Sequence, residues 1–235
     1  IKMHYKLIEG YIHEKTDIDI TSLNYHIDNI SNNYKNEKVY KNNGFLKIIN
    51  NDETIMRIAG NKIIDILSQK LNFSHDKLNM FLSPRLYYTN DKKNTSHRNQ
   101  LPHFDHIRKI KVFLYLEDID EDTGPTEFAP RSNNSLFLKY IRIIRFFSRI
   151  GTKGMKNIFL WNSYSSKLNF SKAIGKKGDI YIFDTDTVHK AGLVKELSKE
   201  RKLLRFDFEI NTHNQNLLLF CYKKISGLKK IISKT

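Results

Sequence analysis

From Asn79 onward the sequence is divided into short runs of β-branched and aromatic residues, and turn residues separate one run from the next. This alternation limits the fold more than any other feature of the chain. Many short strands with few long helices between them are typical of a β-sandwich or a β-barrel. We expect strands at residues 80–89, 110–117, 126–130, 157–161, 179–184, 187–193, 202–210 and 217–222.

Helices are expected before this region and at one place inside it. Residues 1–79 are polar, rich in Asn and favour helix, most clearly at 53–71, where isoleucines form an apolar stripe. Residues 135–150 have the pattern of an inserted amphipathic helix, with basic residues beside its apolar face. A chain of 235 residues can bury one sizeable core. We therefore predict a single domain with a helical scaffold (1–79), a β core (80–222) and a basic tail (223–235).

Composition limits both the partners and the kind of metal site. Cys221 is the only cysteine, so any bound metal must be held by His and carboxylate side chains. The net charge of +15 would attract polyanions, but the lysines are spread over nearly the whole chain and no zinc-finger or RNP pattern accompanies them. No apolar stretch approaches the roughly 20 residues of a spanning helix. We expect neither nucleic acid nor a membrane as the main partner, and take the cytoplasm as the default location.

A candidate metal site begins at His103-Phe104-Asp105, directly before the strongest strand signal. Residues i and i+2 of a strand project from the same face, so this His and Asp can bind one ion side by side. The triplet alone says little, because it recurs at His26-Ile27-Asp28 in a polar segment that favours helix. A third ligand is available at His189, which follows the strand-like run 178–184. We interpret the nearby Asp184 and Asp186 as turn residues.

The set His103, Asp105 and His189 has the composition of the facial triad of non-haem Fe(II) oxygenases, which leaves three coordination positions open. A 2-oxo acid can occupy two of them and leave one for O2. A buried Arg on a neighbouring strand can then bind the distal carboxylate in a bidentate pair, and Arg201 opens such a strand. Lys111, Phe113 and Tyr115 alternate on one face of the strand 110–117. That face either lines the cosubstrate pocket or forms the outside of the barrel.

The order of these features resembles the phytanoyl-CoA dioxygenase family of Fe(II)- and 2-oxoglutarate-dependent oxygenases over about residues 80–210. The resemblance rests on segments 101–106, 111–120, 124–132 and 178–201, and most specifically on Gly124-Pro125-Thr126-Glu127-Phe128-Ala129-Pro130. It implies a double-stranded β-helix, mostly β with flanking helices. It also implies iron on His103, Asp105 and His189, and the 2-oxoglutarate carboxylate on Arg201. Because the spacing from His189 to Arg201 is one residue longer than the family's commonest pattern, Arg205 on the same strand face is the alternative.

The resemblance further implies that Fe(II), 2-oxoglutarate and O2 are used to hydroxylate a small organic or lipid-like substrate. Retention of Asp105 favours hydroxylation over halogenation, which needs a ligand position freed for chloride. The family's usual Pro-Gly-Ser-His is here Pro130-Arg131-Ser132-Asn133, a change that affects a turn but removes no ligand. The basic helix at 135–150 would suit an anionic substrate as a lid. The alternatives are a β-helix that only binds ligands, and a basic protein that binds nucleic acid or a membrane surface.

Overall fold

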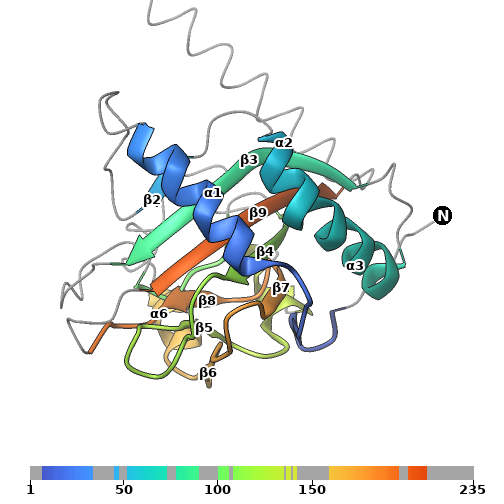
Figure 1. Cartoon of the computed structure of the whole chain (residues 1–235). Coiled ribbons are helices and arrows are strands. Elements are labelled where there is room, and N and C mark those ends of the chain that lie inside the picture. Colours follow the sequence, from blue (N-terminus) through green and yellow to red (C-terminus); the bar gives the residue numbers. More distant parts are fainter. Residues whose placement is uncertain are drawn as a thin grey trace, which may run out of the picture.

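Two antiparallel sheets form the framework in the computed structural model of the chain (Figure 1). The larger sheet has the order β1-β7-β4-β9-β3-β2, and the smaller sheet has the order β6-β5-β8. The structure describes residues 7–33, 45–47, 52–72, 78–89, 100–105, 108–134, 136–138, 140–141, 159–195 and 201–210. The strands of the larger sheet are β1 (Tyr11–Glu14), β2 (Phe45–Lys47), β3 (Leu78–Thr89), β4 (Ile110–Tyr115), β7 (Ile180–Asp184) and β9 (Arg201–Ile210). Those of the smaller sheet are β5 (Thr126–Phe128), β6 (Ser171–Lys172) and β8 (His189–Ala191).

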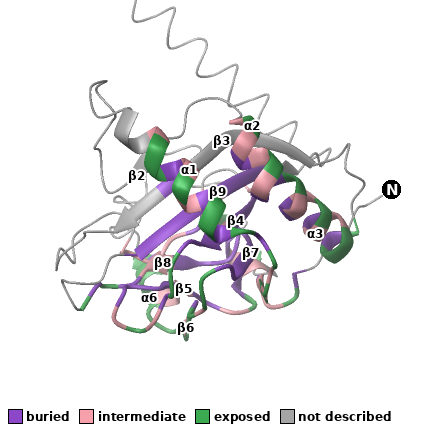
Figure 2. Ribbon diagram, viewed as in Figure 1, coloured by how far each residue is buried: buried purple, intermediate pink, exposed green. Residues whose placement is uncertain are grey.

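Strands β7, β4 and β9 of the larger sheet are buried over most of their length (Figure 2). On β4, Ile110, Val112 and Leu114 join a core shared with the helices. The alternate residues Phe113 and Tyr115 instead pack in the space between the two sheets, together with Phe128 of β5. Because strand side chains alternate between faces, Lys111 also lies on this inner face. Lys111, Phe113 and Tyr115 therefore lie on the inner face of the larger sheet and not on the outside of the barrel.

Helices cover the outer face of the larger sheet (Figure 1). These are α1 (Ile20–Asn33) and a continuous helical stretch made of α2 (Glu53–Ile55), the π-turn η2 (Met56–Gly60) and α3 (Asn61–Leu71). The predicted helix at 53–71 is thus confirmed. Its residues at four-residue spacing, Ile55, Ala59, Ile63, Leu67 and Leu71, are buried against the sheet. The Asp52 side chain accepts a hydrogen bond from the backbone N–H of Ile55 and caps the first turn.

A third packing layer lies outside the smaller sheet. Phe104, Ala129 and Val188 pack there against Trp161 of helix α6 (Phe159–Ser165), and the Phe104 and Trp161 rings meet edge-on at 5.6 Å. Leu138 and Ile141 belong to the same cluster. Because Phe104 points outward into this layer, its neighbours His103 and Asp105 project to the opposite, inner face.

Six of the predicted strands are confirmed, as β3, β4, β5, β7, β8 and β9. The prediction of a strand at 157–161 is wrong where the structure describes it, because α6 begins at Phe159. The described part of the predicted helical scaffold, residues 1–79, contains helices and also two strands that were not predicted. Strands β1 and β2 from this region pair with β7 and β3 at the two edges of the larger sheet.

Several expectations fall partly or wholly outside the described residues. In the predicted inserted helix 135–150, residues 136–138 and 140–141 are helical and the others, with Lys139, Arg142, Arg145 and Arg149, are not described. The predicted strand at 217–222 and the tail 223–235 also lie outside. In the described part of the chain, no helix has the length and apolar character needed to cross a membrane.

Candidate metal centre

His103, Asp105 and His189 converge on the inner face of the smaller sheet. Each offers one ligand atom, and these atoms lie within 4.8 Å of one another. Within the described ranges, no other group of three or more His, Cys, Asp or Glu side chains is arranged to hold a metal. The three residues predicted from the sequence are therefore brought together by the fold.

Backbone pairing sets the spacing of the two histidines. His103 and His189 form an antiparallel bridge, with N–H to carbonyl distances of 3.0 and 2.8 Å, and their ring centroids lie 4.4 Å apart. This bridge places the segment of the His-x-Asp triplet beside β8, so that the smaller sheet carries all three candidate ligands. Asp105 Oδ1 lies 3.9 Å from His189 Nε2.

Both imidazole rings are held in the same tautomer by the backbone. The Nδ1 atom of His103 lies 2.8 Å from the carbonyl oxygen of Leu101, and that of His189 lies 2.8 Å from the carbonyl oxygen of Thr187. A carbonyl only accepts, so each Nδ1 donates and each Nε2 keeps a lone pair for an ion. Burial, the neighbouring His103 and the charge of Lys111 hold the pKa of His189 well below its ordinary value. The ring is therefore neutral near pH 7, as a metal ligand must be.

Lys111 contacts the candidate carboxylate ligand directly. Its Nζ lies 2.7 Å from Asp105 Oδ2, whereas Oδ1 is the oxygen near His189. Burial would raise the pKa of Asp105, but the ammonium group of Lys111, with smaller contributions from His189 and Arg205, outweighs burial and holds that pKa well below its usual range. Asp105 is therefore an anion with one oxygen engaged by Lys111 and the other turned toward the imidazoles.

The inner face beside Lys111 carries further charges. Arg205 donates to the Asp207 carboxylate at 2.5 Å, and Lys109 Nζ lies 3.6 Å from the same oxygen of Asp207. The Asp207 side chain is fully buried. Burial lowers the pKa of Lys111, and the nearby Arg205 lowers it further. The space next to the three candidate ligands is thus lined by charged groups as well as by aromatic rings.

Arg201 occupies a different part of the inner face. Its buried guanidinium donates from Nη1 to the Gly124 carbonyl at 2.6 Å and to the Thr126 hydroxyl at 3.3 Å. Thr126 precedes Phe128 by two residues on β5, and Phe128 is paired with His189 on β8. At about 3.3 Å per residue, the Arg201–Thr126 pair lies roughly 7 Å along the strand from the row of His189.

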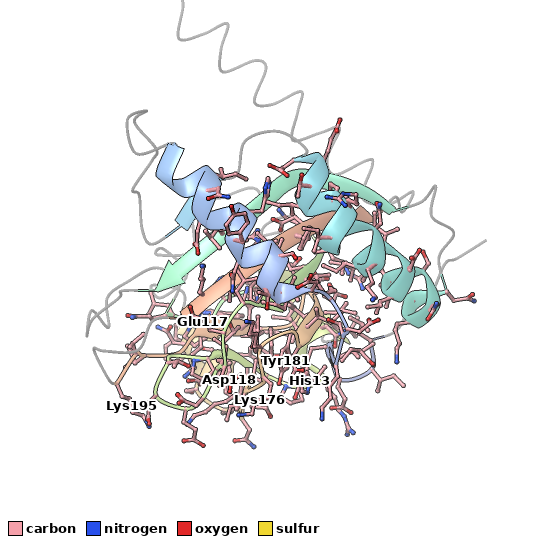
Figure 3. All side chains as sticks on the ribbon, in the orientation of Figure 1. His13, Glu117, Asp118, Lys176, Tyr181 and Lys195 are labelled. Carbon is pink, nitrogen blue, oxygen red and sulfur yellow. The ribbon has the colours of Figure 1, made fainter. Side chains whose placement is uncertain are left out.

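Tyr115 packs in the interior near Arg201. Its hydroxyl donates to the Ala173 carbonyl at 2.7 Å, and burial raises the pKa of the phenol well above its usual value. At the same end of the barrel, where β7 begins, His13 and Tyr181 lie side by side (Figure 3), and their ring centroids are 4.6 Å apart. His13 Nε2 lies 2.8 Å from the Asp179 carboxylate. A role for Tyr115 in binding a cosubstrate stays a prediction.

The second His-x-Asp triplet belongs to the helical layer. His26 of α1 contacts the Asp52 carboxylate at 2.9 Å, and Asp28 pairs with Lys202 at 3.0 Å. Neither side chain joins the candidate metal centre, as the polar, helix-favouring surroundings of this triplet had indicated.

The unusual turn after β5 keeps a conformation that favours glycine. Arg131 has φ 62°, in the left-handed region, at the position where the resembling family has Gly. Such a conformation costs an ordinary residue about 1–2 kcal/mol. Arg131 is held there by its N–H bond to the Glu9 carbonyl at 3.1 Å and by its ion pair with the Glu9 carboxylate. In the same turn, the Ser132 hydroxyl accepts from the backbone N–H of Val188, next to His189, at 2.8 Å.

Two features near the candidate metal centre were not singled out from the sequence. Thr126 was recognised only as part of the Gly-Pro-Thr segment, although that segment's specificity was a usable signal. The contact between Arg108 and Asp184 was also missed. Asp184 was interpreted as a turn residue, whereas it is the last residue of β7, and its partner was not predicted. Only the fold shows that Arg108 and Asp184, which are 76 residues apart, meet and so join the chain segments that carry candidate ligands.

No family model matches this sequence, and no curated protein matches it. Solved structures do match. SnoK, described as a non-heme alpha ketoglutarate dependent carbocyclase from nogalamycin biosynthesis, has 12% identity and a TM-score of 0.62, over 87% of this chain and 81% of its own. The epimerase SnoN, in complex with Fe3+, alpha ketoglutarate and nogalamycin RO, has 16% identity and a TM-score of 0.58, over 87% and 80%. EvdO2 from Micromonospora carbonacea var. aurantiaca, complexed with 2-oxoglutarate, has 11% identity and a TM-score of 0.53, over 86% of each chain.

These likenesses concern the fold, because a fold hosts many activities and the identities are low. The predicted architecture is confirmed by them, whereas the narrower resemblance to phytanoyl-CoA dioxygenases stays a prediction. With its two facing antiparallel sheets and flanking helices, the chain has the double-stranded β-helix fold of these solved structures.

Proposed function

We propose that this protein is an Fe(II)- and 2-oxoglutarate-dependent oxygenase whose iron is held by His103, Asp105 and His189. The observation that carries the proposal is the convergence of three ligand atoms, two from imidazoles and one from a carboxylate, within 4.8 Å of one another. This donor set suits Fe(II) and leaves one side of the ion open. The match to SnoN, a structure that contains Fe3+ and alpha ketoglutarate, supports the assignment.

When bound, iron with 2-oxoglutarate and O2 supplies the oxidising chemistry, and the side chains of this chain bind, orient and shield. The carbonyls of Leu101 and Thr187 hold the two rings so that each Nε2 faces the centre. Lys111 occupies Asp105 Oδ2, so Asp105 would ligate through Oδ1 alone. A carboxylate that binds through one oxygen leaves more of the coordination sphere for cosubstrate and O2.

We assign the distal carboxylate of 2-oxoglutarate to Arg201 together with the Thr126 hydroxyl. A bidentate guanidinium and a neighbouring hydroxyl form a good carboxylate site. Their offset of roughly 7 Å from the row of His189 is comparable to the length of a five-carbon diacid. Arg205, the alternative, already donates to Asp207 and lies beside Lys111 at the metal end of the barrel.

The proposed reaction is hydroxylation of a small organic substrate. Retention of the Asp105 carboxylate keeps the protein ligand set complete, which favours hydroxylation over transfer of a halide. Lys109, Lys111, Arg205 and Asp207 beside the ligands favour a substrate with polar or charged groups over a purely aliphatic one, because an aliphatic chain would bury these charges unsolvated.

An anaerobic titration with Fe(II) and 2-oxoglutarate tests the proposal. The wild-type protein is expected to develop the visible charge-transfer band of an iron chelate, and Asp105→Ala is expected to lose it. Arg201→Gln and Arg205→Gln form a matched pair: only Arg201→Gln should raise the apparent Kd for 2-oxoglutarate by tenfold or more. A wild-type protein that binds no Fe(II) and turns 2-oxoglutarate over only at background rate would instead indicate a β-helix that serves as a binding module.

A further inference from the structure

The turn between β7 and β8 forms hydrogen bonds with two of the three candidate ligands. Its residues run from Asp184 to Thr187. The backbone N–H of Asp105 donates to the Thr185 carbonyl at 3.0 Å, and His189 Nδ1 donates to the Thr187 carbonyl at 2.8 Å. One short turn therefore hydrogen-bonds both Asp105 and His189.

The same turn is also bonded to the segment that follows Asp105. The backbone N–H of Lys109 donates to the Thr185 hydroxyl at 2.8 Å, and the N–H of Thr185 donates to the Lys109 carbonyl at 2.9 Å. These bonds dock the turn against the start of β4. Thr185 is thus hydrogen-bonded both to Asp105 and to Lys109, which lies four residues after it.

An ion pair with a buried carboxylate holds this turn in shape. The Asp184 side chain is fully buried, and Arg108 Nε lies 3.1 and 3.0 Å from its two oxygens, with Nη2 also bonded to Oδ2. Asp184 Oδ1 accepts from the N–H of Asp186 at 2.9 Å, and Arg108 Nε lies 3.5 Å from the Asp186 carboxylate. Asp184 therefore organises its own turn while binding a side chain from another segment.

The ion pair joins the two chain segments that carry ligands. Arg108 lies three residues after Asp105, and Asp184 lies five residues before His189. Such a pair contributes little net stability, because the Asp184 carboxylate must be fully desolvated while Arg108 stays 32% exposed. Its best-supported use is to specify one arrangement, and here that arrangement includes the spacing of two candidate ligands.

We propose that Arg108 is a positioning residue of the metal centre, which acts through Asp184 and the 184–187 turn to hold Asp105 and His189 at the separation that an ion requires. This inference rests on the proposed metal centre. It assigns to Arg108 a role in metal affinity and geometry, with no contact to substrate or cosubstrate.

The test compares Arg108→Gln with Lys176→Gln. Lys176 also pairs with a carboxylate, that of Asp118 at 2.9 Å, but its side chain is 78% exposed. It precedes β7, so this pair lies at the end of the strand opposite to the 184–187 turn. Co(II) is the probe, because its visible spectrum reports ligand geometry and its binding needs no turnover. Loss of a residue that orients a metal ligand typically weakens metal binding about ten- to a hundredfold. We expect that rise in Kd, with an altered Co(II) spectrum, for Arg108→Gln, and a change below about twofold for Lys176→Gln.

The outcomes separate the two proposals. A wild-type protein that binds no Co(II) refutes the metal centre, and this inference with it. If the wild-type protein binds and Arg108→Gln shows the same Kd and spectrum, only the role of Arg108 is refuted. If Arg108→Gln does not fold, judged by circular dichroism without metal, Arg108→Lys replaces it; a lysine keeps the charge but not the forked contact, and unchanged Co(II) binding in that variant overturns the inference.

Discussion

Asp105→Asn is expected to destabilise the metal-free protein because it leaves the Lys111 ammonium group without its carboxylate. The two atoms are 2.7 Å apart, and the side chains are 7% and 18% exposed for Lys111 and Asp105. At an effective dielectric constant of about 20, charges at this distance attract each other by about 6 kcal/mol. Breaking a buried pair by removing one partner typically costs about 3–5 kcal/mol. Because Asp105 is partly exposed and Asp207 also lies near Lys111, we expect a loss near the lower end, about 3 kcal/mol.

The assay is urea unfolding in the presence of a chelator for the wild type, Asp105→Asn, Lys111→Met and the double variant. If the pair exists, the double variant loses less than the two single variants together, with a coupling energy of about 1–3 kcal/mol. Addition of metal at about 100 times its Kd should then stabilise the wild type by about 2.7 kcal/mol. The two variants without the Asp105 carboxylate should gain far less. Additive effects, or an Asp105→Asn protein within about 0.5 kcal/mol of the wild type, would refute the reasoning.

Three further outcomes are expected from other parts of the molecule. Burial raises the pKa of Tyr181 to about 12, so the folded chain keeps a proton that the unfolded chain releases near pH 10. Unfolding in urea should therefore show the wild type losing about 1.4 kcal/mol more than Tyr181→Phe between neutral pH and about pH 11; parallel pH curves would contradict this. Gly124 has φ +71°, and an added Cβ would lie 2.9 Å from the Gly192 carbonyl, so Gly124→Ala should lose about 1–3 kcal/mol in thermal unfolding. It should also weaken 2-oxoglutarate binding, since the Gly124 carbonyl accepts from Arg201; unchanged binding would argue against that site. Phe206→Ala empties a fully buried position on the helix-covered face, so urea unfolding should show a loss of about 3–5 kcal/mol while metal affinity changes little. A large change in affinity would mean that the two faces of the sheet are not independent.

The convergence of the candidate ligands could be predicted from the sequence because it depends on local alternation. His103 and Asp105 are separated by one residue, and the outward position of Phe104 is enough to turn both inward. His189 could be predicted as the third ligand because it begins a strand, and because the fold class brings that strand next to the segment of His103. The same reasoning failed for β1 and β2, because runs of three or four residues in a polar, Asn-rich region carry too few positions to show a period of two.

The strand expected at 157–161 failed for a different reason. A short apolar run does not distinguish a strand from a buried helical turn by periodicity alone. In the structure Trp161 is the buried residue of α6, while Phe159 and Leu160 are exposed. The burial of one side chain, rather than an alternation of buried and exposed residues, therefore characterises this segment. The packing partner of Trp161 is Phe104, far away in the sequence.

Neither alternation nor spacing could decide between Arg201 and Arg205, because both lie on the inner face of β9. The two arginines differ in the groups that their side chains contact. Arg205 meets Asp207 on its own strand, beside Lys111 of the neighbouring β4. Arg201 meets the Gly124 carbonyl and the Thr126 hydroxyl at the start of β5, in the smaller sheet that carries His189. We propose Arg201 for the distal carboxylate because its guanidinium contacts the sheet that carries His189, so a ligand extending along that sheet from the proposed ion would reach it.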